Sequence, residues 1–313
     1  MSESATVPTV SIGLPVYNGE NYLQEAIDSI LSQTYKEFEL IICDNASNDR
    51  TAEICEQVAE SDPRVRYYRN EVNMGATWNF NRTFELARGE YFRWAGHDDR
   101  IDPTFIEKCL AALQEREKDG YVCCWPNTEV MNGEGIVTRQ YEEPELRLES
   151  DVISERFHDG TYVMHSSFQF HGIIRSDVLA KTCKLGQWIS SDYTMIGQLA
   201  LYGKIYQHPE FLFKRREHVH NGYHSCQQDY YEYARFWVPI EKKNSVLFPY
   251  WRMAYEAAKG VFKAPIPFAE RVKCLWYVVS CRNRHRGRSQ YLWDLLYGMR
   301  EYGRKIFDSK ATS

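Results

Sequence analysis

The stretch Tyr91-Phe92-Arg93-Trp94-Ala95-Gly96-His97-Asp98-Asp99-Arg100 decides the fold class that the sequence predicts. Its aromatic first half is typical of a buried strand, and the strand ends in two adjacent acids. Pro103 follows, at a position that suits the start of a helix. A buried strand that ends in carboxylates places them in the crevice where open α/β sheets bind ligands. Two acids there suit a divalent cation carrying phosphates, and a solvated helix-capping turn is the alternative.

Composition sets the first limits. The chain has 313 residues, 43% of them hydrophobic, and a formal net charge of −5. This length is enough for one large core, or for a domain with an appendage. The mildly acidic balance gives no reason to expect nucleic acid as a partner. From about residue 240 onward, however, Lys and Arg outnumber the acids, as in the run Arg282, Arg284, Arg286 and Arg288.

The cysteines indicate a reducing compartment. Nine of them are scattered through apolar segments, and no C-x-x-C pair occurs. We therefore expect free thiols rather than disulfides or a structural zinc site. The first nine residues lack the features of a signal peptide, and no apolar run is long enough to span a membrane. The sequence predicts a cytoplasmic protein, with peripheral contact to the inner membrane surface as an option.

Strands and helices alternate over about the first 125 residues. Apolar strands are expected at 10–17, 38–43, 65–68, 91–94 and 121–125, with amphipathic or capped helices between them. The alternation predicts an α/β fold with a mostly parallel, doubly wound sheet and helices on both faces. No G-x-G-x-x-G or G-x-x-x-x-G-K-[ST] motif occurs, so the dinucleotide-binding and P-loop classes lose their main support.

The first half resembles family 2 glycosyltransferases of the GT-A fold. The resemblance rests on an ordered set of motifs without a break: Pro15-Val16-Tyr17-Asn18, Ser32-Gln33-Thr34-Tyr35, Asp44 to Thr51, Asn73-x-Gly75, Asn81, Ala87-Arg88-Gly89-Glu90-Tyr91 and Asp98-Asp99. It implies a catalytic domain at 1–225, with a nucleotide-binding half at 1–125 and an acceptor half at 126–225. The remainder, 226–313, is expected to be an aromatic, basic and mainly helical extension.

The same resemblance implies a donor site for a nucleotide-diphosphate sugar. Tyr17 would stack near the base, Asp44 would bind base or ribose, Asp98 would face the ribose, and Asp99 would ligate Mn²⁺ or Mg²⁺. His218 fits an Arg-x-x-His element that would complete the metal shell, with His220 as its competitor, and Arg216 would neutralise the leaving diphosphate. Further donor contacts fall on Pro15, Asn18, Asn73 and Gly75. The alternatives are edge packing for Tyr17, a turn or cap for Asp44, and a solvated acid for Asp98.

The second half is less regular. Asn132-Gly133 predicts a hairpin turn, and the residues from Phe168 to Arg175 predict a strand. Asp192 is expected where a loop enters a helix, and the resemblance implies that it is the general base on the acceptor hydroxyl. Its alternative role is a helix N-cap. A further strand from Phe211 is expected to end in the basic cluster before His218.

The C-terminal part suggests contact with another surface. Leu275–Val279 and Tyr291–Tyr297 are expected to lie in amphipathic helices flanked by Arg. Such helices can pack on the catalytic domain, form a homodimer, or lie on an anionic membrane.

Together with the resemblance, these features predict a metal-dependent, inverting glycosyltransferase. The resemblance implies that it builds a cell-surface polysaccharide or a lipid-linked glycan. The acceptor would be a glycan or a lipid-linked molecule. A catalytically silent, membrane-associated assembly subunit and a nucleotidyltransferase are the rival hypotheses.

Overall fold

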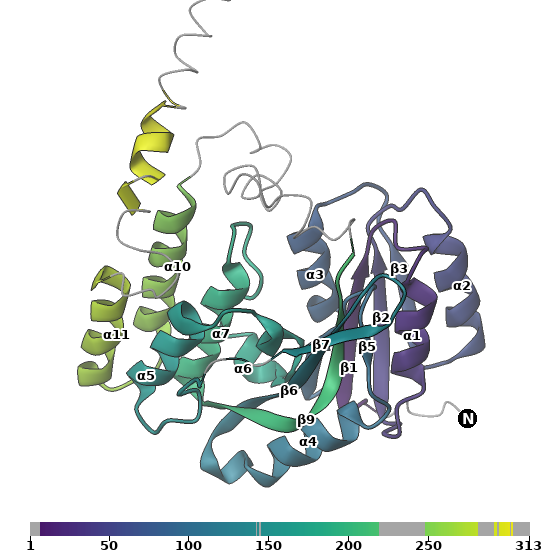
Figure 1. Ribbon diagram of the computed structural model, residues 1–313, viewed down its shortest axis with the longest axis horizontal. Coiled ribbons are helices and arrows are strands. Elements are labelled where there is room, and N and C mark those ends of the chain that lie inside the picture. Colours follow the sequence, from purple (N-terminus) through teal and green to yellow (C-terminus); the bar gives the residue numbers. More distant parts are fainter. Residues whose placement is uncertain are drawn as a thin grey trace, which may run out of the picture.

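The computed structural model describes residues 7–141, 143, 145–218, 248–280, 291–292, 294–300 and 302. Its centre is one large twisted sheet with helices on both sides (Figure 1). Along the sheet the strands follow the order β3-β2-β1-β4-β8-β6-β9-β5, and β7 pairs with β6 outside this path. The predicted α/β class is therefore confirmed.

The first half of the chain forms the parallel part of the sheet. Strands β1 (Val10–Val16), β2 (Phe38–Asp44), β3 (Val65–Arg69) and β4 (Tyr91–Trp94) pair in parallel. They alternate with helices α1 (Leu23–Leu31), α2 (Thr51–Ser61) and α3 (Ala76–Glu85). Strand β1 runs through Pro15, although proline removes a ladder donor; the pairing with β4 ends at Gly13. The carboxyl ends of these strands lie at one edge, as the alternation predicts.

The second half makes the sheet mixed. Strands β6 (Tyr121–Met131) and β9 (Lys204–Arg216) are parallel to each other, while β8 (Ile173–Arg175) lies antiparallel between β4 and β6. Strand β5 (Arg100–Ile101) is antiparallel to β9, and β7 (Val137–Tyr141) forms the hairpin predicted at Asn132-Gly133. The expected parallel arrangement thus holds for β1 to β4 and gives way to a mixed sheet beyond β4.

Two apolar cores lie on opposite faces of the sheet. One joins alternate residues of β1 and β2 to α1, α2 and α4 (Phe105–Glu115). The other joins Phe92 and Trp94 of β4 to α3, α6 (Ser176–Leu179) and α7 (Ser191–Tyr202). Because side chains of a strand alternate between faces, a strand buried on both sides reads as a continuous apolar run.

The strand predicted from Phe168 to Arg175 is wrong in its first part. Phe168–His171 form a 3₁₀ turn, and only Ile173–Arg175 pair as β8. The turn stacks His171 on Phe213, with ring centroids 4.8 Å apart, and brings Phe170 against Trp94 at 5.3 Å. A short apolar run cannot by itself distinguish such a buried turn from a strand.

Helices of the C-terminal part share a core with the second half. Helices α10 (Pro249–Lys263) and α11 (Phe268–Ser280) pack against α5 (Ile153–His158), the π-helical turn Asp159–Val163 and α7. The helix expected over Leu275–Val279 is confirmed as part of α11, and residues 291–292 and 294–300 are helical. No helix among these described residues combines the length and the apolar character that crossing a membrane requires. The division at residue 225 stays a prediction.

Candidate functional site

Asp44 lies at the end of β2, fully buried among donors. Its Oδ1 accepts a hydrogen bond from the Ser47 backbone N at 2.9 Å, and its Oδ2 accepts one from the Tyr67 hydroxyl at 3.0 Å. The Arg69 Nε lies 3.4 Å from Oδ2. The expected turn contact is therefore present, and the carboxylate is held at the strand end in a fixed orientation.

The neighbouring loops are tied to each other through asparagine side chains. The backbone N of Asn18 donates to Ser47 Oγ at 2.9 Å, and Asn18 Oδ1 accepts from the Asn48 backbone N at 3.0 Å. Asn73 Oδ1 accepts from Asn45 Nδ2 and from the Gly75 backbone N, both at 2.8 Å. Gly75 has a φ of +88°, a left-handed value that favours glycine. These contacts bring three of the predicted donor residues, Asn18, Asn73 and Gly75, to the edge of the sheet where Asp44 lies.

Tyr17 and Pro15 complete that edge. Pro15 lies opposite Cys43, one residue before the pair formed by Val16 and Asp44. Tyr17 follows directly and is 46% exposed, unusually open for a tyrosine between buried segments. The ring is available to a planar ligand, as the sequence predicts for a base.

Asp98 and Asp99 have different surroundings although both are buried. Asp98 Oδ2 lies 3.1 Å from His218 Nε2. Asp99 Oδ2 accepts from Arg215 Nη1, and its Oδ1 accepts from the Arg216 backbone N, both at 3.0 Å. Asp99 is thus fixed to the end of β9, while the carboxylate of Asp98 is hydrogen-bonded to the His218 imidazole. His220, the competitor of His218, lies outside the described residues.

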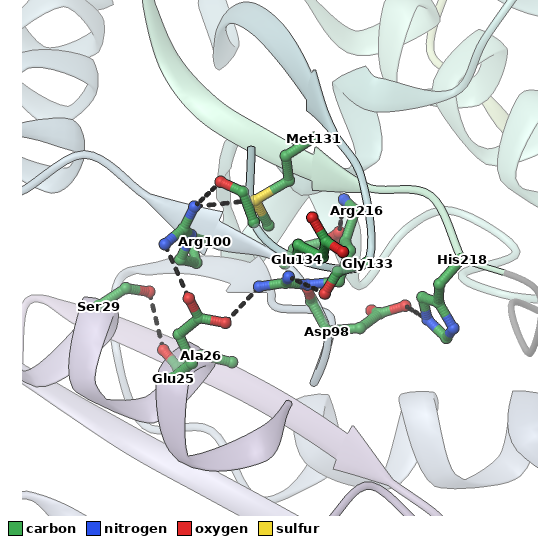
Figure 2. Close-up of polar contacts among 12 residues, drawn as sticks. Glu25, Ala26, Ser29, Asp98, Arg100, Met131, Gly133, Glu134, Arg216 and His218 are labelled. Carbon is green, nitrogen blue, oxygen red and sulfur yellow. Dashed lines mark hydrogen bonds and ion pairs between the residues drawn. The ribbon is translucent and has the colours of Figure 1, made fainter. Parts of the chain in front are cut away.

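Arg216 is enclosed by protein acceptors (Figure 2). Its Nε donates to the Asp98 carbonyl O at 2.8 Å, and its Nη1 donates to the Gly133 carbonyl O at 3.0 Å. Its Nη2 pairs with Glu25, and the guanidinium carbon lies 4.4 Å from the centre of the Tyr22 ring. The carboxylate of Glu25 also pairs with Arg100 Nη1 at 2.7 Å. Arg216 therefore joins helix α1, the loop that contains Asp98 and Asp99, and the β6–β7 hairpin.

The electrostatics differ between the two acids. Burial raises the pKa of Asp98, but the His218 hydrogen bond and the charges of His97 and Arg215 outweigh it, so the pKa lies below its ordinary value. Burial raises the pKa of Asp99, and the Arg215 charge opposes this only in part. Asp98 is consequently an ionised carboxylate at neutral pH, with an imidazole beside it.

Asp98 and His218 are the residues that could hold a divalent cation together with phosphate oxygens. The described residues contain no cluster of three or more His, Cys, Asp or Glu side chains arranged to hold a metal. Mg²⁺ at phosphate-transfer sites is usually held by one or two carboxylates, with the substrate phosphates and water supplying the other ligands. Asp98 could supply one such carboxylate, and the His218 imidazole lies 3.1 Å from it.

Asp192 lies in the first turn of α7, as predicted, and is half-buried. The N-cap position belongs to Ser190, which has a φ of +61°. Asn81 of α3 binds the loop before α7 with both amide atoms, donating to the Leu185 carbonyl O at 2.7 Å and accepting from the Leu185 N at 3.2 Å. This loop is therefore tied to the helix that begins beside Gly75.

Sequence reasoning missed three residues that contact the predicted site residues or their partners, namely Glu25, Arg100 and Arg215. Arg215 carried a signal, because it precedes His218 by three positions and so supplies the arginine of the Arg-x-x-His spacing. Glu25 and Arg216 are 191 residues apart in sequence, and no local sequence pattern predicts their contact.

Comparison with known proteins agrees with this fold. The model of the family described as "Glycosyl transferase family 2" matches residues 11–180. The chain therefore belongs to glycosyl transferase family 2, and it is a glycosyltransferase.

Particular relatives extend the comparison. An uncharacterized glycosyltransferase of Rickettsia typhi is 28% identical over 78% of this chain and 74% of its own length. The hyaluronan synthase of Pasteurella multocida is 33% identical over 48% of this chain, but only 16% of the synthase is covered. The crystal structure of S. aureus TarS 1-349 in complex with UDP-GlcNAc superposes with a TM-score of 0.61 at 17% identity, over 94% of this chain and 81% of that one. The structural likeness supports the GT-A fold.

Proposed function

We propose that this glycosyltransferase transfers a sugar from a nucleotide-diphosphate sugar to an acceptor hydroxyl with inversion at the anomeric carbon. The observation that carries the proposal is the meeting of Asp98 with His218 at the edge of the sheet that also holds Asp44. Relatives support the donor class, since TarS was crystallised with UDP and with UDP-GlcNAc. A hyaluronan synthase and a chondroitin synthase among the relatives support an acceptor that is a growing glycan.

In this proposal the strand-end loops hold the nucleoside. Tyr17 stacks on the base, and Asp44 accepts hydrogen bonds from base or ribose. The backbone around Pro15 and Asn18 forms one wall. Asn73 and Gly75 form the opposite wall, where the glycine leaves open space beside its α-carbon.

A divalent cation, Mn²⁺ or Mg²⁺, would be held by Asp98 and His218. When bound, it would supply positive charge to the diphosphate. Asp99 was the ligand expected from the sequence, but both of its oxygens are engaged by the end of β9. We assign Asp99 the role of fixing Arg215 near the diphosphate, where this guanidinium can stabilise the leaving group. Arg216 acts by positioning the Asp98 main chain instead of contacting the donor.

Asp192 is the proposed general base. It takes the proton of the acceptor hydroxyl while that oxygen forms a bond to the anomeric carbon. The bond from this carbon to the diphosphate oxygen breaks in the same displacement, and the nucleoside diphosphate leaves with the electron pair. One displacement at carbon inverts its configuration. Positioned proton removal is worth about 10²–10⁴-fold in rate.

The same proposal divides the chain into three parts. Residues 1–125 form the nucleotide-binding half and 126–225 the acceptor half of a catalytic domain, with 226–313 as an extension. We place the enzyme in the cytoplasm, in the synthesis of a cell-surface polysaccharide or lipid-linked glycan.

The rival is a catalytically silent assembly subunit, and donor turnover separates the two. Purified protein is incubated with UDP-GlcNAc and other nucleotide sugars, with Mn²⁺ or with a chelator, and the released nucleoside diphosphate is measured. We expect slow, cation-dependent release from one donor, which Asp98→Asn abolishes. Protein that binds a donor but releases nothing, with or without oligosaccharide acceptors, would favour the silent subunit.

A further inference from the structure

The outer face of α10 and α11 is apolar and exposed, although the inner face of each helix is well packed. Met253, Ala257 and Val261 of α10 and Cys274 and Val278 of α11 lie in the core shared with α5 and α7. On the other side, Phe262 is 64% exposed, Phe268 is 77% exposed and Trp276 is 60% exposed. Single exposed apolar residues are ordinary, but large side chains gathered on two adjacent helices mark an interaction surface.

The geometry of the two helices makes this one continuous face. They contact each other and are joined by only four residues, so Phe262 and Phe268 flank the same short connection. Val272 and Trp276 continue from Phe268 at intervals of four, which is one side of a helix. Figure 1 shows both helices at the side of the molecule opposite α1 and α2.

The charge of the face is basic, in contrast to the chain. Helices α10 and α11 contain five Lys or Arg residues and two Glu residues, while the whole chain has a net charge of −5. Neither acid is exposed: Glu256 is buried, and Glu270 is half-buried and accepts a hydrogen bond from the Ser154 backbone N. Lys259, Lys263 and Lys273 are exposed. Lys259 pairs with Glu256 at 3.4 Å and Lys273 pairs with Glu270 at 2.7 Å, so the two acids offset part of the positive charge. The two helices together keep an excess of three basic residues beside the exposed aromatic rings.

We propose that the outer face of α10 and α11 docks on an anionic lipid surface. Aromatic side chains enter the boundary between headgroups and acyl chains, and the lysines meet the anionic headgroups. A second copy of the chain fits less well. A two-fold contact would set this face, with its excess of basic residues, against itself, so that like charges would meet. The inference does not depend on the proposed donor chemistry.

The test is sedimentation of the purified full chain with vesicles. One set is phosphatidylcholine alone, and the other contains about one third phosphatidylglycerol. We expect binding to the anionic vesicles at about 0.1 M salt, much weaker binding at about 0.5 M salt, and little binding to phosphatidylcholine. The double variant Phe262→Ser, Phe268→Ser and the variant Lys263→Glu should each lower the partition coefficient, the double variant at least about tenfold.

Matched controls carry the same chemical changes elsewhere. Ile136→Ser alters an exposed residue of the β6–β7 hairpin, and Lys118→Glu alters an exposed lysine before β6; both should bind like wild type. Unchanged melting temperatures show that the variants are folded. The inference is overturned if wild type does not sediment with anionic vesicles, or if the face variants bind as well as the controls. It is also overturned if light scattering shows a dimer that the double variant dissociates.

Discussion

Replacing Arg216 by Gln should destabilise the protein far more than replacing an ordinary surface arginine. The guanidinium donates to the carbonyl oxygens of Asp98 and Gly133 and pairs with Glu25. Only 1% of the residue is exposed. The variant would leave buried carbonyl groups without their donor and would remove the contact with the Tyr22 ring.

The size of the loss follows from these contacts. A hydrogen bond to a charged group contributes about 1.5–3 kcal/mol, and the contact between cation and ring adds about 0.5–1 kcal/mol. Glu25 is partly exposed, which discounts its share, and the Gln amide can replace one donor. We therefore expect a loss of about 3–5 kcal/mol in the free energy of unfolding, the range for breaking a buried charged pair.

The assay is urea unfolding followed by tryptophan fluorescence, with Arg139→Gln as the matched control. Arg139 pairs with Glu217 at 2.8 Å, but both side chains are exposed, so its loss should stay below about 1 kcal/mol. If Arg216→Gln were no more destabilising than Arg139→Gln, Arg216 would not be the structural link described above. Its direct contact with a diphosphate would then become the better account.

Three further predictions concern the acids. A Cβ at Gly96 would lie 2.5 Å from Asp99 Oδ2 and 2.9 Å from Asp98 Oδ1. Gly96→Ala should therefore displace Asp98 and weaken cation-dependent nucleotide binding at least about tenfold by calorimetry. Unchanged affinity would contradict Asp98 as a ligand of the cation. Burial raises the pKa of Glu39, but hydrogen bonds from Ser11, Arg88 and Arg66 outweigh burial and lower the pKa below its ordinary value. The ionised Glu39 therefore stabilises the folded protein above about pH 4.3, and this stabilisation is lost as pH falls through the lowered pKa. Glu39→Gln should therefore lose about 2–3 kcal/mol in urea unfolding at pH 7 and progressively less than that below about pH 4, and a pH-independent difference would contradict this. Asp192→Asn should lower kcat about 10²–10⁴-fold while nucleotide affinity and melting temperature stay near wild type, and full activity would exclude it as the base.

The sequence was informative where local physics dominates. Apolar runs that end in polar punctuation predicted the strands of the parallel half, because strands buried on both faces leave little room for other patterns. The carboxyl ends of parallel strands share one edge of the sheet, so the sequence could place Asp44 and Asp98 at the same edge.

Contacts between residues far apart in the sequence could not be predicted. Arg215 and Arg216 are adjacent on β9 and their side chains leave opposite faces of the strand, so sequence alone could not tell which one meets Asp99. The 3₁₀ turn at Phe168 depends on Trp94 and Phe213, both distant in sequence. The exchange of roles that we propose between Asp98 and Asp99 likewise depends on where β9 ends.

The most direct test of the donor site is calorimetric titration of nucleoside diphosphates (UDP first, then the other bases) in the presence and absence of Mn²⁺. We predict that one diphosphate binds wild type only with Mn²⁺, that Asp98→Asn removes this dependence, and that a melting curve shows the variant to be folded. Binding that is equally tight without the cation, or that is unchanged in Asp98→Asn, would contradict the assignment of Asp98 and His218 as its ligands.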